Sequence, residues 1–279
     1  FQVARAQRSN FLVDFVADVG LPAILKSIGV INFFIGYVGG ILIFIAGNLA
    51  NWALSLNSNL IYSPTVQIGW LISRDLANLG FVLAIILIAF ATILRMENYE
   101  MKKTLRNLII AALLINFSLV IAGVFLDFAG VLTDFFINKA SGGTIGEAFA
   151  NGLKVQNFLQ VTKDSKSIEQ FIAGMSGMAL VPFVASLFFV AILTTVAAIS
   201  LFALAAMFFI RYIALNILLV IMPIAWLFWV WPDLEGKWKE WWSEFFRWTF
   251  FAPAASFFIY LALSLSEEKN MEKIVALKG

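Results

Sequence analysis

The side chains that could carry chemistry in this chain are few, and the best placed of them share one apolar segment. Asn116, Gly123, Asp127, Gly130 and Asp134 are seven, four, three and four residues apart. At about 100° per residue, these positions fall on one face of a helix. A carboxylate inside a membrane segment is costly and usually faces a bundle interior or a water-filled cavity. The stripe therefore indicates a translocation path or a proton relay, unless its two carboxylates simply extend towards the outer surface.

Two further polar sites interrupt apolar sequence. Arg74, Asp75 and Asn78 cluster where an apolar segment begins, and Asp75 could cap the helix start, where the helix dipole favours an anion. This cluster is either a structural ion pair and cap or a substrate contact. Arg211 is the one cation in residues 178–231, the longest apolar run. It must lie at an interface or have an acidic partner, for which Asp127 is a candidate.

The composition excludes most enzyme chemistry. The chain has no cysteine, hence no disulfide or thiolate, and no histidine, the usual general base and metal ligand. No Gly-rich phosphate-binding loop is present. The net charge of +2 is too small to indicate a basic nucleic-acid-binding face. We therefore expect a protein that is not an enzyme and that uses no cofactor or metal.

The elements that must position these residues are long apolar segments. Of the 279 residues 62% are hydrophobic and 13% charged, and the mean hydropathy is +0.92. A membrane crossing needs about 20 mostly apolar residues. The candidate crossings are 28–54, 76–94, 108–126, 178–207, 212–231 and 250–265. We expect an all-α polytopic membrane protein, with residues 1–279 forming one helical domain of about six crossings.

The link at residues 95–106 sets the expected orientation. It carries four basic and two acidic residues, and short basic loops stay in the cytoplasm. The N-terminus and this loop are then cytoplasmic. Residues 55–75, a re-entrant or surface loop, and the glycine-containing segment 138–170 are external.

Residues 178–231 allow two interpretations. Their length of roughly 80 Å as a helix far exceeds a 30 Å crossing. We prefer two crossings with a tight cytoplasmic turn at Arg211. The alternative is one very long helix, shielded by neighbouring subunits, which gives five crossings and reverses the topology of everything after it.

Two segments have the pattern of helices at the membrane surface. Residues 1–25 mix charged with apolar side chains, which is typical of an amphipathic surface helix. In residues 233–249 one face is rich in tryptophan and the other is charged. The tryptophans, which we expect to anchor this helix at the lipid headgroups, are Trp238, Trp241, Trp242 and Trp248.

The first crossing carries a stripe of small residues. Its members, at spacings of 7, 4, 7 and 4, are Gly29, Gly36, Gly40, Gly47 and Asn51. Such a stripe lets another backbone approach closely. The partner is either another helix of this chain or a helix of a second subunit or small protein.

Two stretches resemble a known family. SPTVQIGWLISRDLANLGFVLAIILIAFATIL (63–94) with LLINFSLVIAG (113–123), and RYIALNILLVIMPIAWLFWVWP (211–232) with FFAP (250–253), are similar to TrbL-like proteins. These are polytopic inner-membrane components of bacterial type IV secretion and conjugation machines. The resemblance covers roughly 63–126 and 205–263.

The resemblance implies a membrane channel or scaffold in the bacterial inner membrane, supporting DNA or protein translocation and pilus assembly. It implies a homo-oligomeric ring, contacts with a pilin or stalk subunit, and cytoplasmic ATPases as energy source. The two helical stripes are then natural subunit or pilin contacts. The main rival is a secondary, proton-coupled transporter that uses Asp127 and Arg211, although the inverted repeats typical of carriers are not evident. An accessory subunit of a respiratory or insertase complex is a third possibility.

Overall fold

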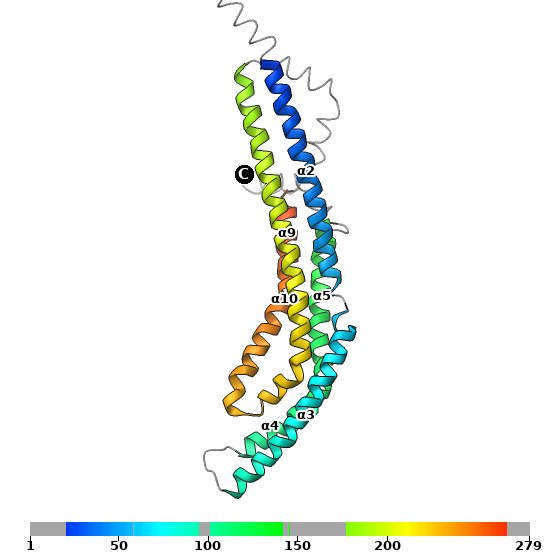
Figure 1. The fold of residues 1–279 in the computed structure, drawn as a ribbon, viewed down its shortest axis with the longest axis vertical. Coiled ribbons are helices and arrows are strands. Elements are labelled where there is room, and N and C mark those ends of the chain that lie inside the picture. The colour runs from blue at the N-terminus through cyan, green and yellow to red at the C-terminus, as the bar shows by residue number, and fades with distance from the viewer. Residues whose placement is uncertain (1–20, 58, 95–100, 142–144, 146–176, 267–279) are drawn as a thin grey trace, which may run out of the picture. The chain divides into compact units, whose positions relative to one another are not determined.

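The computed structural model describes residues 21–57, 59–94, 101–141, 145 and 177–266, and most of these residues lie in helices (Figure 1). The α-helices are α2 (Leu21–Ser55), α3 (Pro64–Ile93), α4 (Met101–Leu114), α5 (Ser118–Ser141), α9 (Gly177–Phe228) and α10 (Glu235–Ser266). Three short 3₁₀ turns join them: η2 (Leu60–Tyr62), η3 (Ile115–Phe117) and η4 (Pro232–Leu234). Among the described residues, five helical stretches are long and apolar enough to cross a membrane. The expected all-α, multi-pass class is confirmed.

The long α9 corrects the preferred interpretation of residues 178–231. A single helix of 52 residues runs through Arg211, so the predicted turn there does not form. The five-crossing alternative is the one that the structure follows. A helix satisfies its own backbone hydrogen bonds, whereas a turn inside an apolar run would leave several unsatisfied.

Other boundaries also differ from expectation. Helix α3 begins at Pro64, directly after Ser63, so residues 64–75 are helical and not part of a loop. Proline suits the first turn of a helix because the backbone N–H there needs no partner within the helix. Residues 101–141 continue through η3 as one candidate crossing, Lys103–Ala140, which is longer than the predicted 108–126. The tryptophan-rich segment and the last crossing belong to one helix, α10.

The chain divides into two compact units. One comprises residues 1–49, 144–203 and 266–279, and the other comprises residues 50–143 and 204–265. In the first unit, α2 and α9 approach closely at Gly39, where an added Cβ would collide with the Thr194 side chain. The predicted surface helix over 1–25 and the external segment 138–170 lie mostly outside the described residues.

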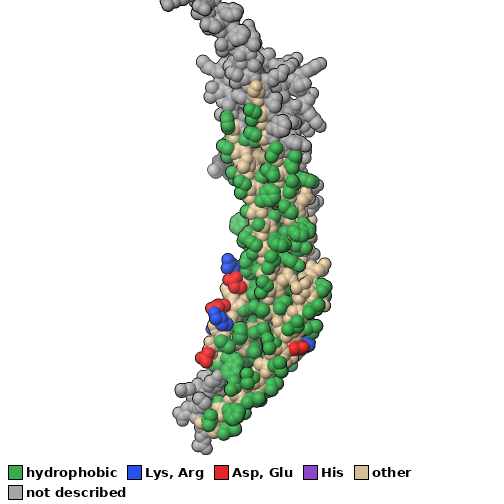
Figure 2. Space-filling model, viewed as in Figure 1, with side chains coloured by type: hydrophobic (Ala, Val, Ile, Leu, Met, Phe, Trp, Pro, Cys, Tyr) green, Lys and Arg blue, Asp and Glu red, His purple; other side chains and the backbone are tan. Residues whose placement is uncertain are grey.

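The second unit contains two apolar cores. One joins α9, α10, α5 and the η2 region, with Leu215, Met222, Trp241 and Phe245 among its buried members. The other joins α3 and α4 and includes Val230. Large apolar side chains are also exposed along these helices, such as Leu79 at 69% and Ile93 at 75%. Figure 2 shows apolar side chains over most of one described face, with charged groups in a few places, as expected of a surface that contacts lipid or other protein.

Candidate functional site

Arg211 is a buried cation that donates hydrogen bonds to two backbone carbonyls. Only 4% exposed, it donates from Nε to the Trp248 carbonyl at 2.8 Å and from Nη2 to the Thr249 carbonyl at 3.3 Å. The acceptors belong to α10, so the hydrogen bonds link two consecutive helices across 37 and 38 residues. Asp127, the expected acidic partner, is exposed and does not share these hydrogen bonds. Burying a cation requires such partners, and here carbonyl dipoles supply them.

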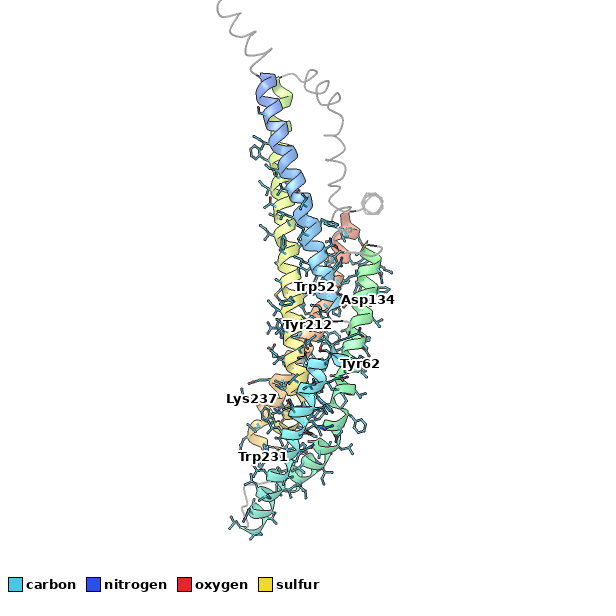
Figure 3. The ribbon with its side chains drawn as sticks, turned by 45° about the vertical axis from the view of Figure 1, so that its right-hand side comes forward. Trp52, Tyr62, Asp134, Tyr212, Trp231 and Lys237 are labelled. Atoms are coloured by element: carbon cyan, nitrogen blue, oxygen red, sulfur yellow. The ribbon has the colours of Figure 1, made fainter. Side chains whose placement is uncertain are left out.

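Some residues of the polar stripe on α5 are packed against other helices, and others are exposed. Gly123 is buried, and a Cβ there would lie 2.8 Å from the tip of Ile61. A Cβ at Gly130 would meet nothing within 4 Å. The carboxylates of Asp127 and Asp134 are exposed, and neither has an ion pair with a described residue (Figure 3 labels Asp134 on α5). This edge of the stripe is therefore open to water, lipid or a partner protein.

Asn116, at the other end of the stripe, forms a side-chain hydrogen bond to the backbone one turn earlier. It is exposed, and its side-chain amide donates to the Ala112 carbonyl at 3.2 Å. This bond spans one helical turn next to η3, where the hydrogen-bonding pattern changes from α to 3₁₀. Its local role is to satisfy backbone at that irregular turn.

The polar cluster on α3 is an ion pair inside the helix, not a cap. Arg74 Nη2 lies 3.0 Å from Asp75 Oδ1, and the guanidinium lies 5.1 Å from the centre of the Trp70 ring. Because α3 begins at Pro64, Asp75 sits in its third turn, and the capping role is wrong. Asn78 is exposed one turn further on.

Next to this cluster lies a hydrogen bond between Trp70 and Ser118 that the sequence did not predict. Trp70 Nε1 donates to Ser118 Oγ at 2.8 Å, and that hydroxyl donates to the Ile115 carbonyl at 2.7 Å. Ser118 is fully buried at the start of α5. These two hydrogen bonds link α3 to the 3₁₀ turn η3. A single serine next to an apolar helix gives no signal in the sequence that predicts such a contact.

The stripe on α2 borders the buried face of that helix. The buried positions include Gly39, Ile43, Ala46, Gly47 and Ala50. Gly40 and Asn51 are half-buried at its edge. Gly29 and Gly36 lie in the helix, but in a part whose side-chain surroundings are not described. A role of this stripe in contacts between subunits stays a prediction.

The tryptophan-rich face of α10 packs against protein. Trp241 is buried, and Trp238, Trp242 and Trp248 are half-buried. The Trp238 ring lies 4.4 Å from the ring of Trp226 in α9, and Trp242 packs edge-on at 6.1 Å against Phe125 in α5. The predicted segregation of faces is present, and the aromatic face fills the core of the second unit. Anchoring at the headgroups stays a prediction for the exposed ring edges.

The opposite face of α10 is charged and internally paired. Glu235 with Lys239, Lys237 with Glu240, and Glu244 with Arg247 form ion pairs of 2.7, 2.8 and 3.1 Å across three or four residues. Exposed pairs of this kind contribute little to stability. Their effect is to keep this helix face polar.

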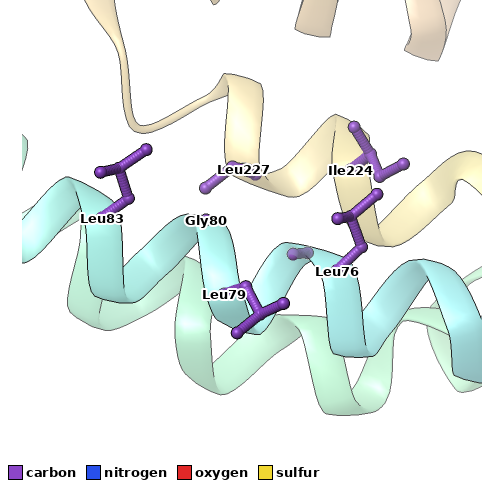
Figure 4. Close-up of a pocket in the computed structure, with 7 residues that line it drawn as sticks. Leu76, Leu79, Gly80, Leu83, Ile224 and Leu227 are labelled. Atoms are coloured by element: carbon purple, nitrogen blue, oxygen red, sulfur yellow. The ribbon is translucent and has the colours of Figure 1, made fainter.

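A shallow hollow lies between α3 and α9 (Figure 4). Its volume is about 330 Å³, and it is lined by Leu76, Ala77, Leu79, Gly80, Leu83, Ile224 and Leu227. The lining is apolar, so the hollow offers no group for catalysis or for binding a charged ligand. Over the described ranges, no group of three or more acidic residues could hold a metal ion.

Two glycines of α3, Gly69 and Gly80, allow α3 and α9 to approach closely. A Cβ at Gly69 would lie 2.6 Å from Val220 Cγ2, and one at Gly80 would lie 2.5 Å from Leu227 Cδ2. Eleven residues, about three turns, separate them, which places them on one face. This spacing was the available signal for a close helix contact.

Comparison with known proteins identifies the family. Residues 70–270, more than two thirds of the chain, match the family described as "TrbL/VirB6 plasmid conjugal transfer like protein". Neither the curated proteins nor the solved structures compared with the chain include a match. The matched range covers most of α3 and all of α4, α5, α9 and α10, and so includes the Arg211 contacts and the α5 stripe. The chain therefore belongs to the TrbL/VirB6 plasmid conjugal transfer-like family, whose members are membrane components of type IV secretion and conjugation systems.

Proposed function

We propose that this protein is an inner-membrane channel or scaffold subunit of a type IV secretion or conjugation machine, supporting DNA or protein translocation and pilus assembly. The observation that carries the proposal is the family match over residues 70–270. Five candidate crossings, an apolar hollow and the lack of histidine and cysteine fit a platform better than a catalyst. The energy for transfer would come from cytoplasmic ATPases of the same apparatus.

The proposed assembly is a homo-oligomeric ring that also contacts a pilin or stalk subunit. In its support, α9 is about 78 Å long at 1.5 Å per residue, against a hydrocarbon layer of about 30 Å. Exposed apolar side chains such as Phe188, Ile199, Ile213 and Ile217 occur along much of it. Lipid can cover only part of such a length, so neighbouring protein must cover the rest.

The proposed orientation places the basic loop 95–106 in the cytoplasm. With five crossings, the α9–α10 link is then also cytoplasmic, and the far end of α5 is external. Because the chain has no cysteine, single replacements at the exposed Lys103, Lys139 and Lys237 report this directly. In whole cells a membrane-impermeant maleimide should label only the variant with cysteine at position 139. Labelling of the variants at positions 103 or 237 would show that the protein has the opposite orientation.

A substitution in the α5 stripe best distinguishes the proposed channel or scaffold function from that of a proton-coupled carrier. Asp127→Asn keeps the size of the side chain and removes its charge. A subunit or cargo contact predicts reduced assembly or transfer with a normal membrane potential, whereas a proton relay predicts complete loss of coupled uptake. The carbonyl contacts of Arg211 weaken the carrier interpretation, because that interpretation pairs Arg211 with Asp127.

The experiment that tests the function is an in-frame deletion in the native host, complemented with the wild-type gene. We expect loss of conjugal transfer or effector secretion, with recovery on complementation. Unchanged transfer and secretion in the deletion strain would contradict the proposal.

A further inference from the structure

Pro223 in α9 and Pro253 in α10 each interrupt the hydrogen-bonding pattern of their helix. Pro253 lies inside α10, and Pro223 lies in α9, five residues before its end. Proline has no backbone N–H, so the carbonyl four residues earlier loses its usual donor, and the ring presses on that carbonyl. The affected carbonyls are those of Thr249 and Leu219. In a membrane such groups must find donors elsewhere.

Arg211 supplies donors at Pro253. Its two hydrogen bonds reach the carbonyl of Thr249, which Pro253 leaves without a donor, and that of Trp248, one residue earlier. A guanidinium presents several N–H groups in a rigid fork, which suits two adjacent carbonyls. The long-range placement of this buried cation thus coincides with the proline break in the α10 backbone pattern.

Trp241 makes the corresponding contact in the other direction. Its Nε1 donates at 3.3 Å to the carbonyl of Leu218, the residue before Leu219. Arg211 precedes Pro223 by twelve residues, and Trp241 precedes Pro253 by twelve. In two antiparallel helices joined by a short link, equal spacings bring each donor next to the other helix's proline.

We propose that α9 and α10 form a reciprocally braced hairpin, in which each helix donates a hydrogen bond to the other at the carbonyl that the partner helix's proline releases or at the carbonyl one residue before it. The brace holds the bend of α10, whose direction changes along its length in Figure 1. Arg211 is then a positioning residue for the backbone of α10. Within residues 204–265 the two helices are held rigidly at these contacts, and the bend at Pro253 is fixed and does not act as a hinge.

A double-mutant cycle tests the larger of the two contacts. Arg211→Ala, Pro253→Ala and the double variant are unfolded with SDS in mixed micelles. Arg211→Ala should raise the unfolding equilibrium constant roughly 10- to 100-fold, the range for a hydrogen bond to a charged group. In the Pro253→Ala background the same change should have a smaller effect, because the alanine at that position returns an N–H to the Thr249 carbonyl, while the bond to the Trp248 carbonyl is lost in both backgrounds.

Control substitutions near the two contacts distinguish the loss of a hydrogen bond between α9 and α10 from a general loss of packing. The Thr249 Oγ1 and Trp226 Nε1 atoms are buried without hydrogen-bond partners among the described residues. Thr249→Val should therefore be neutral or stabilising, although it lies beside the proposed contact. Trp226→Phe also shrinks a ring that packs 4.4 Å from Trp238, so it measures the loss of packing without loss of the brace. Trp241→Phe removes the indole donor together with part of a buried ring; the packing loss is common to both backgrounds, so it should destabilise the wild type more than the Pro223→Ala variant.

A distance measurement tests the fixed bend. Spin labels at Lys239→Cys and Leu261→Cys, both exposed, flank Pro253 on α10. Arg211→Ala should broaden the distance distribution, and Pro253→Ala should lengthen and sharpen it. Equal destabilisation by Arg211→Ala in both backgrounds would overturn the proposal. So would a double variant that fails to fold when Pro253→Ala alone folds.

Discussion

The close approach of α3 and α9 predicts a strong and position-specific penalty for enlarging Gly69. In Gly69→Ala the new methyl would lie 2.6 Å from Val220 Cγ2 and 2.9 Å from Cγ1. Ordinary contacts begin near 3.4 Å, so something must move by most of an ångström. Valine is held in one rotamer within a helix, which leaves movement of the backbone as the main response.

The magnitude follows from two opposing terms. Overpacking of this kind costs about 1–3 kcal/mol. Replacing glycine by alanine inside a helix returns about 1 kcal/mol. We therefore expect Gly69→Ala to lower the free energy of unfolding by about 1 kcal/mol, within about 0–2 kcal/mol.

Two other glycines provide matched controls. At Gly80 the new methyl would meet the tip of Leu227, a flexible side chain that lines the α3–α9 hollow and can swing into it. Gly80→Ala should be close to neutral. At Gly130 nothing lies within 4 Å, so Gly130→Ala should stabilise the isolated subunit by up to about 1 kcal/mol.

The assay is SDS unfolding in mixed micelles, followed by far-UV circular dichroism. The predicted order of stability is Gly130→Ala, Gly80→Ala, then Gly69→Ala. In a Val220→Ala background the penalty at Gly69 should vanish, because only the Val220 Cβ, at 3.4 Å, then remains close. Gly69→Ala as stable as Gly130→Ala, or a penalty that survives Val220→Ala, would refute the proposed contact.

Three further outcomes follow from the contacts described above. Trp70→Phe should lower the free energy of unfolding by about 1 kcal/mol in the wild type and by less in a Ser118→Ala background, as a double-mutant cycle would show. Arg247→Ala breaks an exposed ion pair and a 5.6 Å cation–π contact with Trp248, so the free energy of unfolding should fall by less than about 2 kcal/mol; a larger loss would mean that this face is buried in a partner contact. Phe208→Ala should cost about 3–5 kcal/mol through the cavity it leaves, whereas Phe258→Ala, at 67% exposed, should cost little when both are measured in the same micelles.

The apolar segments of this protein were predictable because the membrane imposes a simple rule. Long apolar runs must become helices, since these alone satisfy their backbone inside lipid. The predicted boundaries were less accurate. Residues 64–75 contain polar groups and a proline, which favour a loop locally, yet they extend α3 because Val66 and Ser73 are buried against other parts of the second unit.

Arg211 shows why the site was harder to predict. A lone cation in an apolar run favours an interface or a salt bridge by local reasoning. Its acceptors are carbonyls 37 and 38 residues further along, available because of Pro253. Nothing near Arg211 in the sequence carries that information. The aromatic face of α10 is a similar case: its pattern was evident, but whether lipid or protein covers it depends on the placement of α5 and α9.

The central claim is that this protein works as part of a type IV secretion or conjugation apparatus. The most direct measurement is purification of the tagged protein from its native membrane after mild cross-linking, followed by mass spectrometry and by determination of its oligomeric state. We predict a homo-oligomer that brings with it cytoplasmic ATPases and a pilin or stalk subunit, all encoded by the same transfer system. A monomer or dimer that is stable and free of these partners, from cells active in transfer, would contradict the account.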